Sequence, residues 1–127
     1  MDANLNRARE GLRVLEDGCR FVLGNRSLYS GCRELRHALD RRTRTFYPEL
    51  LKARNSEGDI GKDEVAWSQR NTPAVLTANV RRVQEALRVL EEFSRLCPHS
   101  AHQKYKGLRF KMYTLEKKLA ASLERHR

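Results

Sequence analysis

The sequence predicts an all-α protein with a four-helix core, built from one helix pair that is copied once. The run Leu12–Glu16 recurs without change as Leu87–Glu91, and the same spacing relates Arg7 to Arg82. Apolar residues return at the 3.6-residue period of a helix. Only three prolines interrupt the 127 residues, and few runs are β-branched. A repeat of this length indicates duplication of one structural unit.

The apolar periods and their end signals predict four helices. The first runs from about residue 3 to 23 and ends at Gly24, the second from Ser27 as N-cap to 46, the third from Pro73 to 96, and the fourth from 101 to 124. They form two halves, about 1–48 and 73–126, joined by a long loop over about 49–72. We expect one helical domain over 1–127, with space left for a homodimer.

The charge of the chain indicates an anionic partner but does not identify which one. A net charge of +10 predicts attraction to anions such as nucleotides, phosphorylated metabolites, nucleic acid or acidic membrane surfaces. The sequence shows no signal peptide and no hydrophobic span, so we expect a cytoplasmic protein that does not enter a membrane. The three cysteines lack metal-site spacing and lie on apolar stripes, which predicts buried thiols: Cys19, Cys32 and Cys97.

The arginines carry the main functional signal. Arg7 and Arg82 fall inside the apolar arcs of their helices, each with an asparagine one turn earlier, Asn4 and Asn79. A guanidinium that faces the core keeps its charge, so it needs a carboxylate or an anion from outside. Glu10, Glu85 or Glu116 could serve as that carboxylate. The alternative is that ligand phosphates satisfy them.

Two further arginines stand at equivalent places on the second and fourth helices, Arg36 and Arg109, with Tyr113 beside the latter. The four arginines would then outnumber the nearby acids and converge on a highly anionic small ligand. Glu16 and Glu91 are placed on the outer faces of their helices, as members of weak surface ion pairs.

The polar loop holds Arg54, Asp59 and two glycines, Gly58 and Gly61. Glycines let a backbone approach a ligand closely, and an aspartate beside phosphates commonly holds Mg²⁺. An ordinary connector explains the same residues. The chain has neither a Walker A motif nor a dinucleotide-binding glycine fingerprint. Three other readings stay open: a basic module that binds RNA or DNA, a docking domain without chemistry, and an arginine-lined enzyme of the chorismate mutase type.

Four runs resemble a small helical domain often fused to bacterial thiamine-phosphate synthase. They are Asp2–Asp17, Arg54–Gly61, Ala78–Glu92 and Leu108–Lys117, in the order and spacing of that family. The resemblance implies a kinase that converts hydroxymethylpyrimidine monophosphate to the diphosphate with ATP in thiamine biosynthesis. Lys62 departs from the family loop, which has threonine there. The synthase barrel is absent, so coupling to thiamine-phosphate synthase would join separate proteins.

Residues and resemblance together assign the site. Phosphoryl transfer needs mainly positioning and charge neutralisation. The expected partners are a phosphorylated pyrimidine and a nucleotide, without nucleic acid. Catalytic roles go to Arg7, Arg82, Asp59 and Glu85; ligand-binding roles to Asn4, Arg36, Arg54, Asn79, Arg109, Tyr113 and Gly61; and Mg²⁺-binding roles to Asp59, Glu10 and Glu116.

Overall fold

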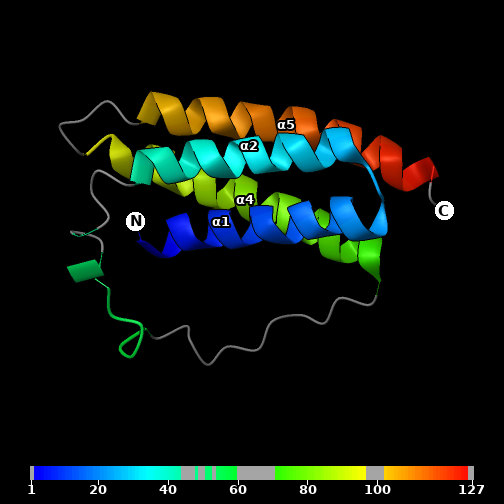
Figure 1. The fold of residues 1–127 in the computed structure, drawn as a ribbon. Coiled ribbons are helices and arrows are strands. Elements are labelled where there is room, and N and C mark those ends of the chain that lie inside the picture. The colour runs from blue at the N-terminus through cyan, green and yellow to red at the C-terminus, as the bar shows by residue number, and fades with distance from the viewer. Residues whose placement is uncertain are drawn as a thin grey trace.

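The computed structural model describes residues 2–43, 48, 51–52, 54–59, 71–96 and 102–125, with the backbone alone at residues 42 and 43. Its long helices are α1 (Asp2–Asp17), α2 (Arg26–Thr43), α4 (Thr72–Ser94) and α5 (His102–Arg125), labelled as in Figure 1. The short π-helix η1 (Gly18–Val22) continues α1. No strand occurs in these ranges, so the all-α prediction is confirmed.

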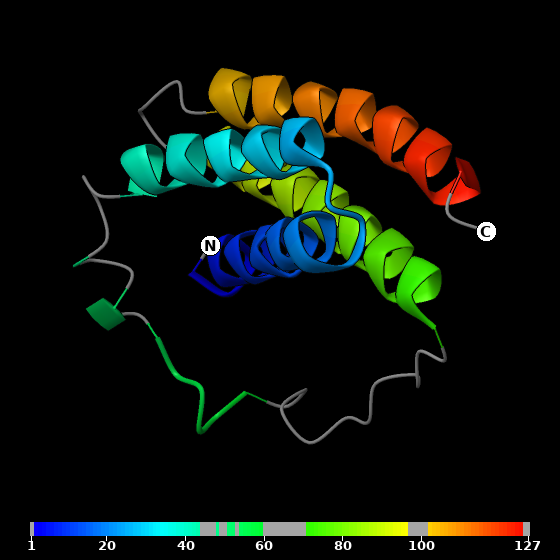
Figure 2. The same ribbon diagram turned by 45° about the vertical axis from the view of Figure 1, so that its right-hand side comes forward.

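The helices form two antiparallel pairs. α1 packs against both α2 and α4, and α4 packs against both α1 and α5, while α2 also contacts α5. Figures 1 and 2 show α1 and α4 side by side on one side of the bundle, with α2 and α5 on the other. The α1–α2 hairpin and the α4–α5 hairpin are thus related by approximate twofold symmetry, as the repeat predicts.

One apolar core lies between the four helices. Leu12, Leu15, Val83, Leu87 and Leu90 are each at most 2% exposed. The periodicity of these residues defined the expected stripes, and their burial provides most of the driving force for folding. Cys19 and Cys32 are free and buried, as predicted. Cys97 lies outside the described residues.

The helix ends follow local signals, with one correction. Gly24 adopts a φ of 59°, a left-handed conformation that suits glycine after a helix. Asn25, and not Ser27, begins α2: its side-chain Oδ1 accepts a hydrogen bond from the Leu28 amide at 3.0 Å. Asn71 caps α4 by accepting from the Ala74 amide at 2.8 Å, with Pro73 in the first turn.

The prediction that Glu16 and Glu91 lie on outer faces is wrong. They are 2% and 1% exposed. The prediction divided each helix into one inner and one outer face, but α1 and α4 each contact two neighbouring helices. Their covered surface is therefore wider than a single apolar stripe. None of the described helices combines the length and apolar character needed to cross a membrane.

Candidate functional site: a groove between α1 and α4

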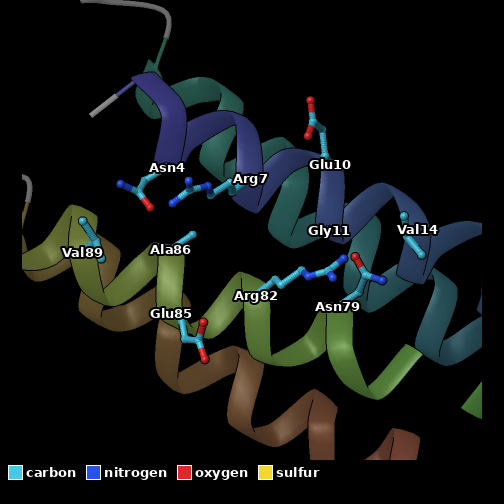
Figure 3. A pocket seen from close by; sticks show the side chains of 10 residues that line it. All are labelled: Asn4, Arg7, Glu10, Gly11, Val14, Asn79, Arg82, Glu85, Ala86 and Val89. Atoms are coloured by element: carbon cyan, nitrogen blue, oxygen red, sulfur yellow. The ribbon is translucent and has the colours of Figure 1, made fainter. Parts of the chain in front are cut away.

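A groove of about 590 Å³ lies along the contact of α1 with α4. Each helix contributes five of the ten lining residues shown in Figure 3, and each residue of α1 has its repeat-equivalent in α4. The equivalent residues are Asn4 and Asn79, Arg7 and Arg82, Glu10 and Glu85, Gly11 and Ala86, and Val14 and Val89. The approximate twofold axis of the molecule therefore passes through this groove.

Gly11 sets how closely the two helices approach. A Cβ atom at this position would lie 2.7 Å from Cγ2 of Val83 and 3.4 Å from the carbonyl oxygen of Asn79. The first distance is well inside van der Waals contact, so only a residue without a side chain fits. The close approach brings Arg7 and Arg82 to opposite walls of one narrow groove.

The structure places Arg7 and Arg82 on the open groove and not in the core. Both side chains are exposed, which corrects the expectation that they face inward. In Figure 3 each guanidinium lies between the two helices, next to the asparagine one turn earlier. Neither arginine forms an ion pair or hydrogen bond with any residue that the structure describes. Two uncompensated cations therefore face the same cavity.

The asparagines differ in how firmly they are held. Asn79 is 7% exposed, and its Nδ2 donates a hydrogen bond to the carbonyl oxygen of Val75 at 2.8 Å. Its donor is thus directed back along α4. Asn4 is half-buried and lies beside Arg7. The ligand-orienting role predicted for both asparagines stays a prediction.

Glu10 and Glu85 stand on the groove rim. Both are exposed, and Figure 3 shows their carboxylates directed away from the space between the arginines. Neither carboxylate forms an ion pair with Arg7 or Arg82, so both guanidinium groups stay open to a ligand.

Mg²⁺ has no preformed cage in the described part of the chain. No group of three or more Asp, Glu, His or Cys residues there could hold a metal ion. Glu116 is half-buried on α5 and does not line the groove, and Asp59 is exposed and follows the turn at Glu57 and Gly58. Among the described residues there is no preformed Mg²⁺ site, and the metal-binding roles of Asp59, Glu10 and Glu116 stay predictions.

Arg36 and Arg109 do not join Arg7 and Arg82. Arg36 donates to Glu16 from Nε at 2.5 Å and from Nη2 at 3.0 Å, and Arg109 donates from Nε to Glu91 at 2.9 Å. The expectation that four arginines outnumber the nearby acids and converge is therefore wrong. Of these four arginines, two form ion pairs inside the bundle and two lie on the open groove.

The two internal ion pairs shift the pKa values of their members. Burial alone would raise the pKa of Glu91, but the hydrogen bond and charge of Arg109 outweigh it and hold the pKa below its ordinary value of 4.5. The hydrogen bond from Arg36 to Glu16 raises the pKa of Arg36. Arg109 also donates from Nη1 to the Tyr113 hydroxyl at 2.9 Å, so that tyrosine supports an ion pair and does not line the groove.

The loop residues meet the N-terminus of α1. Arg54 binds the Asp2 carboxylate through Nε at 2.5 Å and Nη2 at 2.8 Å. This contact fixes one point of the connection near the Asn4 end of the groove, although Arg54 does not itself line it. The predicted backbone contact at Gly61 lies outside the described residues.

Sequence reasoning missed Glu16 and Glu91 as the partners of Arg36 and Arg109. A signal was present, because both charges of each pair recur across the duplication. An acid and a base that both recur on neighbouring helices predict an internal ion pair. This single interpretation replaces the two separate ones, surface pairs for the acids and ligand binding for the arginines.

Comparison with known proteins finds relatives that are thiamine-phosphate synthases. It is 46% identical over 123 residues to the thiamine-phosphate synthase of Nostoc punctiforme, which covers 94% of this chain and 34% of that protein. It is 43% identical over 126 residues to the thiamine-phosphate synthase of Synechocystis, covering 96% of this chain and 36% of that protein. The chain therefore spans about a third of the length of these curated relatives. No solved structure matches it closely enough to carry an argument.

These names correct one expectation. The resemblance implied a hydroxymethylpyrimidine-phosphate kinase, but the relatives at 43% to 46% identity are called thiamine-phosphate synthases. The kinase assignment is therefore overturned, and the synthase name belongs to proteins of which this chain matches only a part. The part it matches has a family of its own: over residues 1–118 the sequence fits the ThiD2 family, and the chain belongs to that family.

Proposed function

We propose that the α1–α4 groove binds hydroxymethylpyrimidine monophosphate as a ligand of thiamine biosynthesis. One observation carries the proposal: Arg7 and Arg82 face one cavity from opposite walls, and neither has a partner among the described residues. Guanidinium groups bind phosphate oxygens in a bidentate geometry. The relatives' name supports the pathway, since it refers to a phosphorylated product of that biosynthesis.

The groove has the size and polarity for a small phosphate ester. Its volume of about 590 Å³ falls within the usual range for small-molecule sites. Val14 and Val89 supply apolar surface at its two ends, against which a pyrimidine ring could pack. The proposal therefore assigns the phosphate to the arginines and the ring to the valine surface.

Titration calorimetry with hydroxymethylpyrimidine monophosphate tests the proposal. Arg7→Met and Arg82→Met should each weaken binding by about tenfold or more, because each removes a charge-assisted hydrogen-bond donor. Arg13→Met is the matched control: it removes the same charge from an exposed position of α1 that does not line the groove. Equal losses in all three variants would show that only the overall charge attracts the ligand.

ATP and Mg²⁺ as further ligands are part of the same proposal and need a separate measurement. Titration with ATP, with and without MgCl₂, should compete with the monophosphate if both use the arginines of the groove. Analysis of the same mixtures for a diphosphate product provides a direct check on the corrected assignment. Formation of the diphosphate would contradict that correction.

A partner follows from the relatives as well. Their name supports functional coupling of this chain to a thiamine-phosphate synthase. Co-purification of the two proteins, with and without the monophosphate, tests this coupling. Binding of duplex DNA or RNA in place of the monophosphate would favour the alternative of a basic nucleic-acid module.

A further inference from the structure

Exposed apolar side chains gather on the two helices that form the groove. Among the described residues, five of the eight large apolar side chains that are exposed belong to α1 and η1 or to α4 and the two residues after it, and α2 has none. Their exposed fractions run from 38% to 81%, and they are Val14, Phe21, Val22, Phe93 and Leu96. A group of exposed apolar side chains on a folded domain indicates a surface that a partner covers.

These side chains recur at the two ends of the groove. Val89 lines the groove on α4, and Phe93 follows it at i+4, on the same side of the helix. On α1, Val14 is the repeat equivalent of Val89, and Phe21 is the equivalent of Leu96. Figure 3 shows Val14 and Val89 at opposite ends of the groove, because α1 and α4 run antiparallel. The order apolar, charged, apolar is therefore the same in both directions along this face.

The charges between the apolar ends make the face complementary to itself. Figure 3 shows Glu85 of α4 level with Arg7 of α1, and Glu10 of α1 level with Arg82 of α4. Neither acid forms an ion pair with any residue in the described ranges. A second copy turned by 180° about an axis parallel to the helices brings its α4 over α1, so that its Glu85 faces Arg7. The same rotation brings its Glu10 over Arg82, as a twofold interface requires.

We infer that the groove face is the interface of a homodimer, in which Glu85 of each copy binds Arg7 of the other. The apolar core lies within one copy, so the chains fold first and associate reversibly. A guanidinium has five N–H donors, so a ligand and the second copy's carboxylate can both bind Arg7. The dimer thus encloses the groove and adds an acid from the second copy to each site. This inference goes beyond the proposed function, since the interface forms without a ligand.

Sedimentation equilibrium of the protein without ligand tests the dimer. One chain has a mass of 14.8 kDa, and the wild type should reach twice that mass as its concentration rises. Arg7→Glu and Glu85→Arg should each weaken association by about tenfold or more, because each sets like charges against one another at two symmetric contacts. An equimolar mixture of these two variants should dimerise again, since each of those contacts in the mixed dimer joins opposite charges.

A matched pair of phenylalanines separates this face from apolar exposure in general. Phe93 and Phe110 are 56% and 53% exposed, but Phe110 lies on α5, away from the contact of α1 with α4. Phe93→Asp should weaken association by about tenfold or more, because the interface would bury an unpaired charge. Phe110→Asp should leave association unchanged. Circular dichroism of every variant confirms that the fold is retained.

Several outcomes would overturn the dimer. They are a mass of one chain at every concentration, a mixture of Arg7→Glu and Glu85→Arg that stays monomeric, and equal weakening by Phe93→Asp and Phe110→Asp. Binding of a thiamine-phosphate synthase to a monomer, lost in Phe93→Asp, would assign the face to that protein instead. The proposed function survives each of these results if the wild type still binds hydroxymethylpyrimidine monophosphate. Dimerisation without binding of the monophosphate would reject the proposed function alone.

Discussion

The four arginines that the sequence singled out fall into two sets, which differ in whether a described carboxylate pairs with them. Arg36 and Arg109 are paired inside the bundle with Glu16 and Glu91, whose side chains are 2% and 1% exposed. Arg7 and Arg82 are exposed and lack a described partner. Arginines that recur in both halves of the molecule therefore serve structure in one set and are available for ligands in the other.

Stability measurements should separate the two sets. Arg109→Met leaves the Glu91 carboxylate buried without its main partner, which costs about 3–5 kcal/mol of unfolding free energy. Arg82→Met removes an exposed side chain and should change stability by less than about 0.5 kcal/mol. Urea unfolding followed by circular dichroism measures both. A similar loss in the two variants would mean that Arg82 has a structural partner after all.

The Glu91 pair also predicts a pH dependence. Because the folded-state pKa of Glu91 is lowered from 4.5, the unfolded chain binds the proton more readily than the folded protein. The pair's contribution is therefore complete above the ordinary value and is lost as pH falls through the lower, folded-state pKa. Acid unfolding of the wild type should show this loss below about pH 4.5.

Glu91→Gln provides the comparison for that titration. It cannot ionise, so its unfolding free energy should be lower at neutral pH and should fall less steeply in acid. Glu92→Gln is the matched control, since Glu92 is adjacent, carries the same charge and is exposed. Parallel acid titration curves for the wild type and Glu91→Gln would rule out this origin of the pH dependence.

Individual residues show where prediction from sequence succeeds and where it stops. The repeat singled out Arg7, Arg82, Asn4 and Asn79, and the structure brings all four to one groove. It could not decide whether these residues face the core or an open cleft, because a helical wheel gives direction but not the distance to the next helix. Burial of Glu16 depends on α2, which the wheel of α1 does not contain.

At the scale of the helices, the α1–α4 crossing is the contact on which the groove depends. Gly11 and Val83 meet there so closely that a methyl group on Gly11 would displace the Val83 side chain. Val83 is fully buried, so it has little room to move. The width of the groove is therefore set by one glycine and one valine.

Gly11→Ala should destabilise the protein through this contact. Overpacking costs about 1–3 kcal/mol, of which about 1 kcal/mol is returned by the better helix propensity of alanine. Val83→Ala removes the obstructing methyl groups, so the double variant should be more stable than the sum of the two single losses predicts. A double-mutant cycle from urea unfolding measures this coupling. Strict additivity would show that Gly11 does not limit the approach of the helices.

Gly107→Ala is the control for helix propensity. Gly107 lies within α5, and a Cβ there would meet no atom within 4 Å. The substitution should raise the unfolding free energy by about 0.5–1 kcal/mol. The difference between Gly107→Ala and Gly11→Ala then reports packing alone.

The π-helix was not predictable from the pattern. The sequence indicated a continuous helix to residue 23, whereas the structure changes to π-helical turns over Gly18–Val22. Over so few residues, apolar spacing does not distinguish the wider turn from a regular one. Gly18 lies against the Leu76 side chain, where a Cβ would overlap it. That contact joins α4 to the end of α1, and it cannot be predicted from the sequence pattern of either helix alone.

For the whole molecule, the duplication predicted the architecture better than any single helix did. Two copies of a helix pair, each with one apolar stripe, bury those stripes by packing pair against pair. The structure has this arrangement, and α1 against α4 is the main contact between the two pairs. The connection between the halves was expected as a loop from polar composition, and only its residues 51–52 and 54–59 are described, with residue 48 before them.

The two halves are complementary and not interchangeable, which predicts that neither folds alone. At the α1–α4 crossing, Gly11 is matched with Val83, whereas the equivalent residues of the other half are Ala86 and Ala8. Two copies of residues 71–127 would bring Ala86 against Val83 and overpack the crossing, and two copies of residues 1–59 would set Gly11 against Ala8 and leave a void. Each fragment should therefore show low helicity by far-UV circular dichroism, and equimolar mixing should restore it. If Val83 is what prevents self-association, Val83→Ala in residues 71–127 should make that fragment better able to self-associate. A cooperative thermal transition in either unchanged fragment alone would show that the pairing is not selective.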